Sequence, residues 1–260
     1  MKDSPGKTAL ITGASTGIGR DLAELFARDG HHLVITARND SLLQDLANKL
    51  RDQYHVNVDV IVQDLSAPDA AQRVFEQLQA RRIDYLVNNA GFGTHGPFAE
   101  SDLPTELAML QVNMVALTHL TRLFLPPMLQ RRSGRIMNVA SVAGFLPGPL
   151  MAVYFATKAY VLSFSEALCG EVAGSGVTIT ALCPGATITE FQKRAGIEAS
   201  ALFRTNAMSS ATAARIGYKT MMNGRRSVVT GLSNKLSVFG LRFIPRAAAA
   251  AMAKKLNESR

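Results

Sequence analysis

The sequence has 260 residues, of which 47% are apolar and 18% charged, which excludes a mainly disordered chain and favours one large α/β domain with a substantial core. Its two cysteines match no metal-ligand spacing and are too few for a disulfide framework, so we predict no metal site and a reducing, cytoplasmic compartment. No apolar run reaches the roughly 18 residues of a transmembrane helix, and the N-terminus lacks the apolar core of a signal peptide.

The net charge of +8 is concentrated at the C-terminal end. Residues 211–260 contain ten Lys or Arg and one acid, Glu258, which gives +9 there and therefore −1 for residues 1–210. Such a segment can meet nucleic acid, an acidic ligand or lipid, or it can be a solvated basic face. It contains no Tyr-rich or motif-like platform, so we predict no nucleic-acid partner, and a solvated face is the simplest interpretation.

A short apolar run, Thr8–Thr12, predicts a buried strand that leads into a glycine-rich loop and then a helix. This arrangement points the N–H groups of a helix N-terminus at an anion, and glycines let a pyrophosphate approach the backbone. The spacing is G-x-x-x-G-x-G and many sharp turns look alike, so the position between strand and helix carries the prediction. The predicted phosphate-binding residues are Gly13, Ser15, Thr16, Gly17, Ile18 and Gly19.

The end of the second predicted strand, His32–Ala37, indicates the cofactor. An acidic residue there would bind the free ribose 2′-hydroxyl of NAD. Here the strand is followed by Arg38, whose guanidinium can pair with a 2′-phosphate, and Arg20 lies just after the glycine loop. We therefore predict NADP(H); the alternative is that Arg38 is a solvated residue at the end of a strand.

A helix over residues 41–52, an alternating strand over residues 56–62 and a helix over residues 68–79 follow. Asp64 lies at the end of this strand, next to Leu65. Its side chain can hydrogen-bond the adenine amino group, or it can serve as an N-cap or turn residue.

The next predicted strand, Tyr85–Val87, leads into small and amide residues, which suit the close approach of a flat ligand. We expect Asn88 to bridge neighbouring strands. His95, in the following loop, can be catalytic, but a loop histidine near a cofactor is more often a contact residue. The predicted cofactor contacts in this region are Asn89, Ala90 and Gly91.

A long helical stretch over residues 104–131 carries Asn113 among apolar neighbours. A buried asparagine must satisfy its amide, so Asn113 either caps or bridges structure or holds a water that links Lys158 to solvent. The strand over residues 135–139 then delivers Ser141 to the carboxyl edge of the sheet, where open parallel sheets bind ligands.

Tyr154 and Lys158 are four residues apart in a helix predicted over residues 151–172, so they share one helix face. A free tyrosine has a pKa of about 10, and a neighbouring ammonium favours the phenolate. We therefore expect a lowered phenol pKa, suited to proton exchange at neutral pH. Ser141 adds a hydroxyl that can hydrogen-bond the substrate oxygen, and these three groups suit hydride chemistry beside a nicotinamide.

The last predicted strands cover residues 177–183 and 227–230. After the first of them, Thr187 and Thr189 can each bond a carboxamide or phosphate, and residues 191–210 are expected to cover a ligand, with a plain surface loop as the alternative. Strands alternate with helices throughout, and no repeat or composition break marks a second domain. We predict a single α/β domain, a doubly wound and mainly parallel sheet with helices on both faces.

Together these motifs make the chain resemble the short-chain dehydrogenase/reductase family. The matching residues are TGASTGIG (Thr12–Gly19), Asp64, NNAG (Asn88–Gly91), Asn113, Ser141, Tyr154-x-x-x-Lys158, and Pro184-Gly185 with Thr189. Each motif alone is modest, but chance agreement of all of them in this order and spacing is negligible.

The resemblance implies a seven-stranded Rossmann fold and hydride transfer between NADP(H) and a carbonyl or alcohol. It assigns general acid/base chemistry to Tyr154 and orientation of the substrate oxygen to Ser141. It makes Lys158 lower the tyrosine pKa and bond the nicotinamide ribose, and Asn113 hold a relay water. The further cofactor contacts that it implies are Asp64 at the adenine, Asn89 near the adenosine ribose, Pro184, Gly185, and Thr189 near the carboxamide.

Within the family, the chain resembles bacterial broad-range oxidoreductases that are similar to reductases of 3-oxoacyl chains and steroids. This implies a hydrophobic carbonyl substrate and a homodimer or homotetramer. The pocket is expected from residues 92–98, 145–151 and 191–208, which are apolar and Met-rich. The alternatives are an NAD-dependent alcohol dehydrogenase and a dinucleotide-binding sensor without turnover; intact Tyr154 and Lys158 argue against the sensor.

The basic C-terminal extension, residues 232–260, mixes apolar residues with Lys and Arg. One hypothesis is that it touches a membrane surface or lipid-like substrates. We favour the simpler alternative, that it packs over the substrate pocket or in an oligomer contact.

Overall fold

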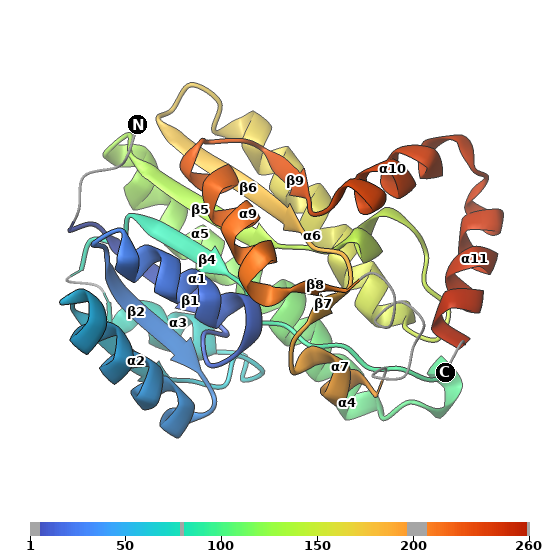
Figure 1. Cartoon of the computed structure of the whole chain (residues 1–260), viewed down its shortest axis with the longest axis horizontal. Helices are drawn as coiled ribbons and strands as arrows, with labels where there is room; N and C mark the ends of the chain where they lie inside the picture. The colour runs from blue at the N-terminus through green and yellow to red at the C-terminus, as the bar shows by residue number, and fades with distance from the viewer. Residues whose placement is uncertain (1–5, 79–80, 197–206, 259–260) are drawn as a thin grey trace.

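The computed structural model describes residues 6–78, 81–196 and 207–258, which form an open parallel sheet between two layers of helices (Figure 1). Residues 197–206 of the expected substrate-covering segment lie outside the described residues. The strands of the sheet are β1 (Thr8–Thr12), β2 (His32–Ala37), β3 (Val58–Val62), β4 (Tyr85–Asn88), β5 (Gly134–Val139), β6 (Val177–Cys183) and β9 (Ser227–Val229). Their order is β3-β2-β1-β4-β5-β6-β9, with every neighbouring pair parallel, as the predicted doubly wound fold requires.

Helices cover both faces of this sheet. They are α1 (Gly17–Arg28), α2 (Asp40–Tyr54), α3 (Ala70–Glu76), α4 (Leu103–Leu110), α5 (Leu117–Gln130), α6 (Ala152–Glu171), α7 (Phe191–Ala195), α9 (Ser210–Met222), α10 (Leu232–Gly240) and α11 (Arg246–Glu258). In β1, Ala9 and Ile11 join the core formed with α1, α2 and α9, whereas Leu10 joins the core formed with α3, α5 and α6. Successive residues of one strand thus point into different cores. Because both faces of the sheet are covered, the sequences of its strands are continuous apolar runs.

The chain reverses its direction across the sheet between β1 and β4. Strands β2 and β3 follow on one side of β1, and β5, β6 and β9 follow on the other side of β4. The loops after β1 and β4 therefore lead away from each other at the carboxyl edge, and a crevice for a ligand opens where they part.

Most predicted elements are found, with shifts of a few residues at their ends. The third strand begins at Val58 rather than at residue 56, and Val62 is exposed because β3 is the edge of the sheet. The long helix predicted over residues 104–131 is interrupted by a π-helical segment, Gln111–Ala116, which the sequence pattern does not reveal.

Other features were not predicted either. Helix α9 packs closely through small residues besides Tyr218 and Met221: a Cβ added to Gly217 would lie 2.6 Å from Cδ2 of Leu182 on β6. A short parallel pair, β7 (Thr187–Ile188) with β8 (Met208–Ser209), joins the two ends of the intervening segment.

Phe26 connects α1 to the sheet and to α9. Its ring, fully buried, lies 5.1 Å from Tyr85 and meets Tyr218 edge-on at 4.8 Å between ring centroids. The Tyr218 hydroxyl donates a 2.8 Å hydrogen bond to Asp29 at the end of α1. This contact fixes the helix whose N-terminus forms part of the site described below.

Replacing Phe26 with Ala should lower the free energy of unfolding by about 3–5 kcal/mol, because the change leaves a cavity among three packed elements. Urea denaturation measures this loss. The matched control is Phe98→Ala, at a side chain 61% exposed, for which we expect a change within about 0.5 kcal/mol. Equal losses in the two variants would contradict the assignment of Phe26 to the core.

Candidate active site

A cavity of about 690 Å³ lies at the carboxyl edge of the sheet, where the loops after β1 and β4 part. Its wall runs from Arg38 and Asp64, after β2 and β3, to Tyr154 and Lys158 on α6. It thus brings together residues from nearly every predicted motif. The predicted cofactor residues on this wall are Gly13, Ser15, Thr16, Gly17, Ile18, Arg38, Asp64, Leu65, Asn89, Ala90, Gly91, Pro184, Gly185, Thr187 and Thr189.

The glycine loop at the start of α1 has the geometry of an anion site. Gly13 and Gly17 have φ of +65° and +55°, a region that favours glycine. Thr16 is the N-cap in an extended conformation, and its side chain makes no capping hydrogen bond. The first N–H groups of α1 are therefore open to the cavity, together with the positive end of the helix dipole.

Gly19 does not line the cavity but allows the loop to close behind it. A Cβ at Gly19 would lie 2.4 Å from both Nδ2 of Asn89 and the carbonyl oxygen of Gly13. Asn89 donates from that same Nδ2 to the carbonyls of Thr12, at 2.9 Å, and Gly13, at 3.1 Å. The structure thus adds to Asn89 a role in supporting the phosphate loop, and the space that the loop leaves fits a pyrophosphate.

Arg38 lies at the opposite end of the wall from Tyr154 and Lys158. Its side chain is exposed and makes no hydrogen bond or ion pair with another described residue. The neighbouring Asn39 caps α2 by accepting a 3.0 Å hydrogen bond from the N–H of Leu42, so the chain turns sharply here. A guanidinium without a partner at this position is free to bind an anionic group in the cavity.

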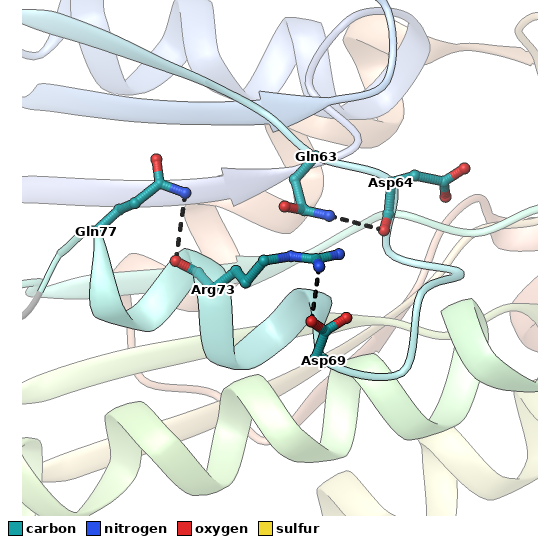
Figure 2. A network of polar contacts seen from close by, with 5 residues as sticks. All are labelled: Gln63, Asp64, Asp69, Arg73 and Gln77. Atoms are coloured by element: carbon teal, nitrogen blue, oxygen red, sulfur yellow. Dashed lines mark hydrogen bonds and ion pairs between the residues drawn. The ribbon is translucent and has the colours of Figure 1, made fainter.

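Asp64 forms a turn at the end of β3. Its Oδ1 accepts a 2.9 Å hydrogen bond from the N–H of Ser66, while Gln63 donates to the Asp64 carbonyl at 3.1 Å. Figure 2 shows the Asp64 carboxylate turned away from Gln63 and from the ion pair of Arg73 with Asp69, which measures 2.6 Å. The turn role considered from the sequence is therefore present, and the second carboxylate oxygen remains available at the cavity wall.

Asn88 bridges two strands, as predicted. Its Nδ2 donates to Oδ1 of Asn138 on β5, at 2.9 Å, and to Oγ1 of Thr121 on α5, at 3.0 Å. Asn138 in turn donates to the hydroxyl of Ser165 on α6, at 2.9 Å. These buried bonds fix α6 against the sheet, and with it Tyr154 and Lys158, which line the cavity.

Ser141, Tyr154 and Lys158 meet at one end of the cavity. Ser141 follows β5 and caps a short 3₁₀ turn, Val142–Phe145, by accepting a 3.1 Å hydrogen bond from the N–H of Ala143. Its hydroxyl donates a long hydrogen bond of 3.4 Å to the carbonyl of Pro184 and lies beside the Tyr154 phenol. Lys158 is buried, and its Nζ lies 5.8 Å from the centroid of the Tyr154 ring.

The pKa of the Tyr154 phenol is raised by burial to about 12, although the neighbouring Ser141 hydroxyl acts in the opposite direction. The expected lowering of this pKa is therefore wrong for the structure. The reason is that the Lys158 ammonium directs a 2.8 Å hydrogen bond to the carbonyl of Val139 rather than to the phenol. Burial also lowers the pKa of Lys158 to about 8.

Asn113 lies behind the cavity wall, in the π-helical segment. Its Nδ2 donates to the carbonyl of Phe92, at 2.9 Å, and to Oγ1 of Thr157, at 3.1 Å, while its Oδ1 accepts from the N–H of Phe92, at 3.1 Å. The bridging role considered from the sequence is present: the side chain ties the loop after β4 to α6. The relay water assigned to Asn113 stays a prediction.

The turn after β6 closes the cavity above the glycine loop. The N–H of Gly185 donates to Oγ1 of Thr230 at 3.3 Å, and Thr187 donates to the Gly185 carbonyl at 2.9 Å. The Thr189 methyl group packs on the loop so closely that a Cβ at Gly17 would lie 2.9 Å from it. The glycine loop and the turn after β6 thus contact each other and line the same part of the cavity.

Helix α11 supplies a wall that the sequence did not assign to particular residues. Ala253, Leu256 and Asn257 line the cavity. Asn257 is buried and donates to the carbonyl of Pro149 at 2.8 Å, and its own carbonyl is 3.0 Å from Nε2 of His95. His95 therefore contacts α11, and it is not among the residues that line the cavity. The sequence did contain a signal for this wall: Ala249, Ala253 and Asn257 recur at intervals of four residues and so share one helix face.

A parallel sheet with an open glycine loop at its carboxyl edge is the arrangement in which doubly wound folds bind dinucleotides. A family model described as short chain dehydrogenase matches residues 7–200. The chain belongs to this family.

Individual proteins of similar sequence include a reductase and an oxidoreductase. The very-long-chain 3-oxoacyl-CoA reductase of Rattus norvegicus is 32% identical over 192 residues, which make up 72% of this chain and 62% of the rat protein. The chain thus spans less than two thirds of that relative's length. An uncharacterized oxidoreductase of Staphylococcus saprophyticus is 34% identical over 187 residues, 71% of this chain and 80% of that protein.

Solved structures match over nearly the whole chain. A short-chain dehydrogenase from Sphingobium yanoikuyae in complex with NADPH superimposes with a TM-score of 0.83 at 35% identity, covering 95% of this chain and 99% of that one. A bulky-bulky ketone specific alcohol dehydrogenase from Comamonas testosteroni gives a TM-score of 0.79 at 30% identity, covering 96% and 99%.

In the protein without added cofactor, Tyr154 should stay protonated at about pH 10.5, because burial holds its pKa at about 12 while a free tyrosine ionises near pH 10. Ultraviolet difference absorbance between the wild type and Tyr154→Phe measures its ionisation, with free tyrosine amide as the reference. A difference equal to one full phenolate at that pH would contradict the raised pKa.

Proposed function

We propose that the protein is an NADP(H)-dependent oxidoreductase that transfers a hydride between the nicotinamide and a hydrophobic ketone, aldehyde or secondary alcohol. One observation carries this proposal: a single cavity has an unpartnered Arg38 at one end and the Ser141–Tyr154–Lys158 cluster at the other. The open phosphate loop lies between them, in the order that the parts of a dinucleotide require.

The bound nicotinamide would supply the hydride, which is chemistry that no side chain of the protein offers. In reduction, Tyr154 donates its phenolic proton to the substrate oxygen, and the hydride and this proton together convert the carbonyl to an alcohol. A pKa of about 12 keeps Tyr154 in its acid form at neutral pH, which suits this direction. The oxidation requires the phenolate, and an ammonium brought nearer to the phenol favours that form.

Ser141 and Lys158 position the reacting groups. The Ser141 hydroxyl, fixed by its cap on the 3₁₀ turn, can hydrogen-bond the same substrate oxygen as Tyr154. Lys158 uses one N–H for the Val139 carbonyl, and its remaining donors are available for ribose hydroxyls. Asn113 holds the loop after β4 and, through Thr157, the helix turn that carries both catalytic side chains.

The preference for NADP(H) rests on Arg38. No acidic side chain follows β2 immediately, and Arg38 is available for a 2′-phosphate. Among the similar structures, one from Sphingobium yanoikuyae holds NADPH and one from Burkholderia phymatum holds NAD. Both cofactors therefore occur among relatives, and NAD-dependent alcohol oxidation is the competing proposal.

A hydrophobic substrate is supported by the apolar wall beyond Tyr154. Phe191, at the start of the proposed substrate-covering segment, lies 5.1 Å from the Tyr154 ring. The names of two relatives, a reductase of 3-oxoacyl-CoA and an alcohol dehydrogenase specific for bulky ketones, point in the same direction. The other apolar residues of this wall are Phe92, Leu146, Met151, Phe155 and Leu256.

We further propose that residues 191–210 and the basic extension over residues 232–260 serve the substrate end of one catalytic domain. Helices α7 and α11, which belong to these two segments, both reach the cavity wall. A homodimer or homotetramer and a cytoplasmic location stay predictions.

Tyr154→Phe should lower kcat for carbonyl reduction about 100-fold or more, because the proton donor is lost while the ring is kept. The dissociation constant of NADPH, measured by the change in its fluorescence, should change little. Undiminished turnover would rule out the proposed acid, and a parallel loss of NADPH binding would mean that the hydroxyl serves the cofactor instead.

Arg38→Ala should raise the Km for NADPH about tenfold or more and leave the Km for NADH nearly unchanged, because only NADPH carries the 2′-phosphate. Steady-state kinetics with both cofactors measures this effect. Arg73→Ala is the matched control, since Arg73 already pairs with Asp69. A wild-type enzyme that prefers NADH tenfold would contradict the assignment of Arg38.

A further inference from the structure

The C-terminal arm, which we define as residues 232–258, leaves an apolar face uncovered. It comprises α10, a 3₁₀ turn over Leu241–Phe243 and α11, and Figure 1 shows it at the edge of the molecule, beyond the helix layers. No residue of α10 or of the 3₁₀ turn is buried. Helices in water normally bury their apolar side, but the apolar side of α10 has no partner among the residues that the structure describes.

The exposed apolar side chains recur at helical spacing. Leu232, Leu236, Phe239 and Phe243 are 73%, 65%, 56% and 76% exposed, and intervals of four, three and four residues place them along one side of α10 and its continuation. The two phenyl rings meet edge-on at 5.4 Å. Clustered large apolar groups of this kind mark an interaction surface rather than scattered surface residues.

The same arm is strongly basic. It contains five cations and one acid, Glu258, and therefore carries a net charge of +4. Lys254 pairs with Glu258 at 3.4 Å, and the Arg242 guanidinium lies 6.0 Å from the Phe239 ring. The cations that have no acidic partner among the described residues are Lys235, Arg242, Arg246 and Lys255.

We propose that the C-terminal arm binds an anionic lipid surface, with the apolar side of α10 entering the headgroup region and the cations meeting lipid phosphates. A segment that joins exposed aromatic and aliphatic side chains to unpaired Lys and Arg has the composition of an interfacial helix. A second copy of the chain satisfies these groups less well, because two arms in contact would bring +4 against +4.

The position of the arm also connects the surface to the cavity. Helix α11 presents Ala253 and Leu256 to the cavity, and Asn257 fastens it to Pro149 and His95. Docking of the arm would therefore hold the substrate end of the cavity next to the lipid. Resting on the proposed function, this step predicts carbonyl substrates that are drawn from a membrane.

Sedimentation of the full chain with vesicles tests the lipid binding directly, without any measurement of turnover. Binding to phosphatidylcholine vesicles with about 30 mol% phosphatidylglycerol should be at least tenfold tighter than to phosphatidylcholine alone, and it should weaken at high salt. The double variant Leu236→Glu/Phe243→Glu should lose this binding at least tenfold. Arg242→Gln/Arg246→Gln should lose roughly tenfold on the anionic vesicles, because two phosphate partners are removed.

The matched control is Leu42→Glu/Val62→Glu, which places two charges on exposed apolar positions far from the arm and should bind vesicles like the wild type. All variants change exposed side chains, and an unaltered thermal midpoint verifies their folding. Absence of binding to anionic vesicles, or equal binding by the Leu236→Glu/Phe243→Glu variant, would overturn the proposal. If that variant instead converts a dimer to a monomer in light scattering, a second copy occupies the surface. Loss of turnover in Tyr154→Phe tests only the chemistry.

Discussion

The hydrogen bond from Lys158 to the carbonyl of Val139 is the contact on which the Ser141–Tyr154–Lys158 end of the cavity depends. It joins α6 to the last residue of β5, two residues before Ser141, so one buried side chain ties the segment that carries Ser141 to the helix that carries Tyr154. A buried ammonium needs acceptors, and a backbone carbonyl at the end of a strand is available because no further ladder partner claims it. Gly91, close to this cluster, leaves room for the Asn113 amide, since a Cβ there would lie 3.1 Å from Oδ1 of Asn113.

Burial of this cluster shapes its chemistry in opposite ways. It raises the pKa of the Tyr154 phenol and lowers that of the Lys158 ammonium, so both groups are shifted toward their neutral forms. A site of this kind responds strongly to any charge placed in it, because little water screens the interaction. In the proposed reduction the protonated phenol is the form required, and an ammonium nearer to it would lower its proton affinity.

The sequence predicted the parts that depend on neighbours along the chain, and missed those that depend on packing. The glycine loop, Arg38 and the Tyr154–Lys158 pair could be placed because strand, turn and helix signals surround them. Helix α9 was missed because Ala213, Ala214 and Gly217 make up much of its buried face, and its large buried side chains, Tyr218 and Met221, lie only in its second half. The direction of the phenol pKa shift could not be read, since it depends on desolvation and on the hydrogen bond that draws the ammonium toward Val139.

The π-helical segment Gln111–Ala116 sets the rotational phase between α4 and α5. A wide turn holds about one residue more than an α-helical turn, and each residue of an α-helix advances the direction of the side chain by about 100°. Within one uninterrupted α-helix, Asn113 and the apolar face of α5 would not both point inward. The extra residue in the wide turn thus allows Asn113, at the centre of the helical stretch, to bond the loop after β4 while α5 packs its apolar face into the core. Shortening this segment by one residue would retain the helix and misdirect the amide.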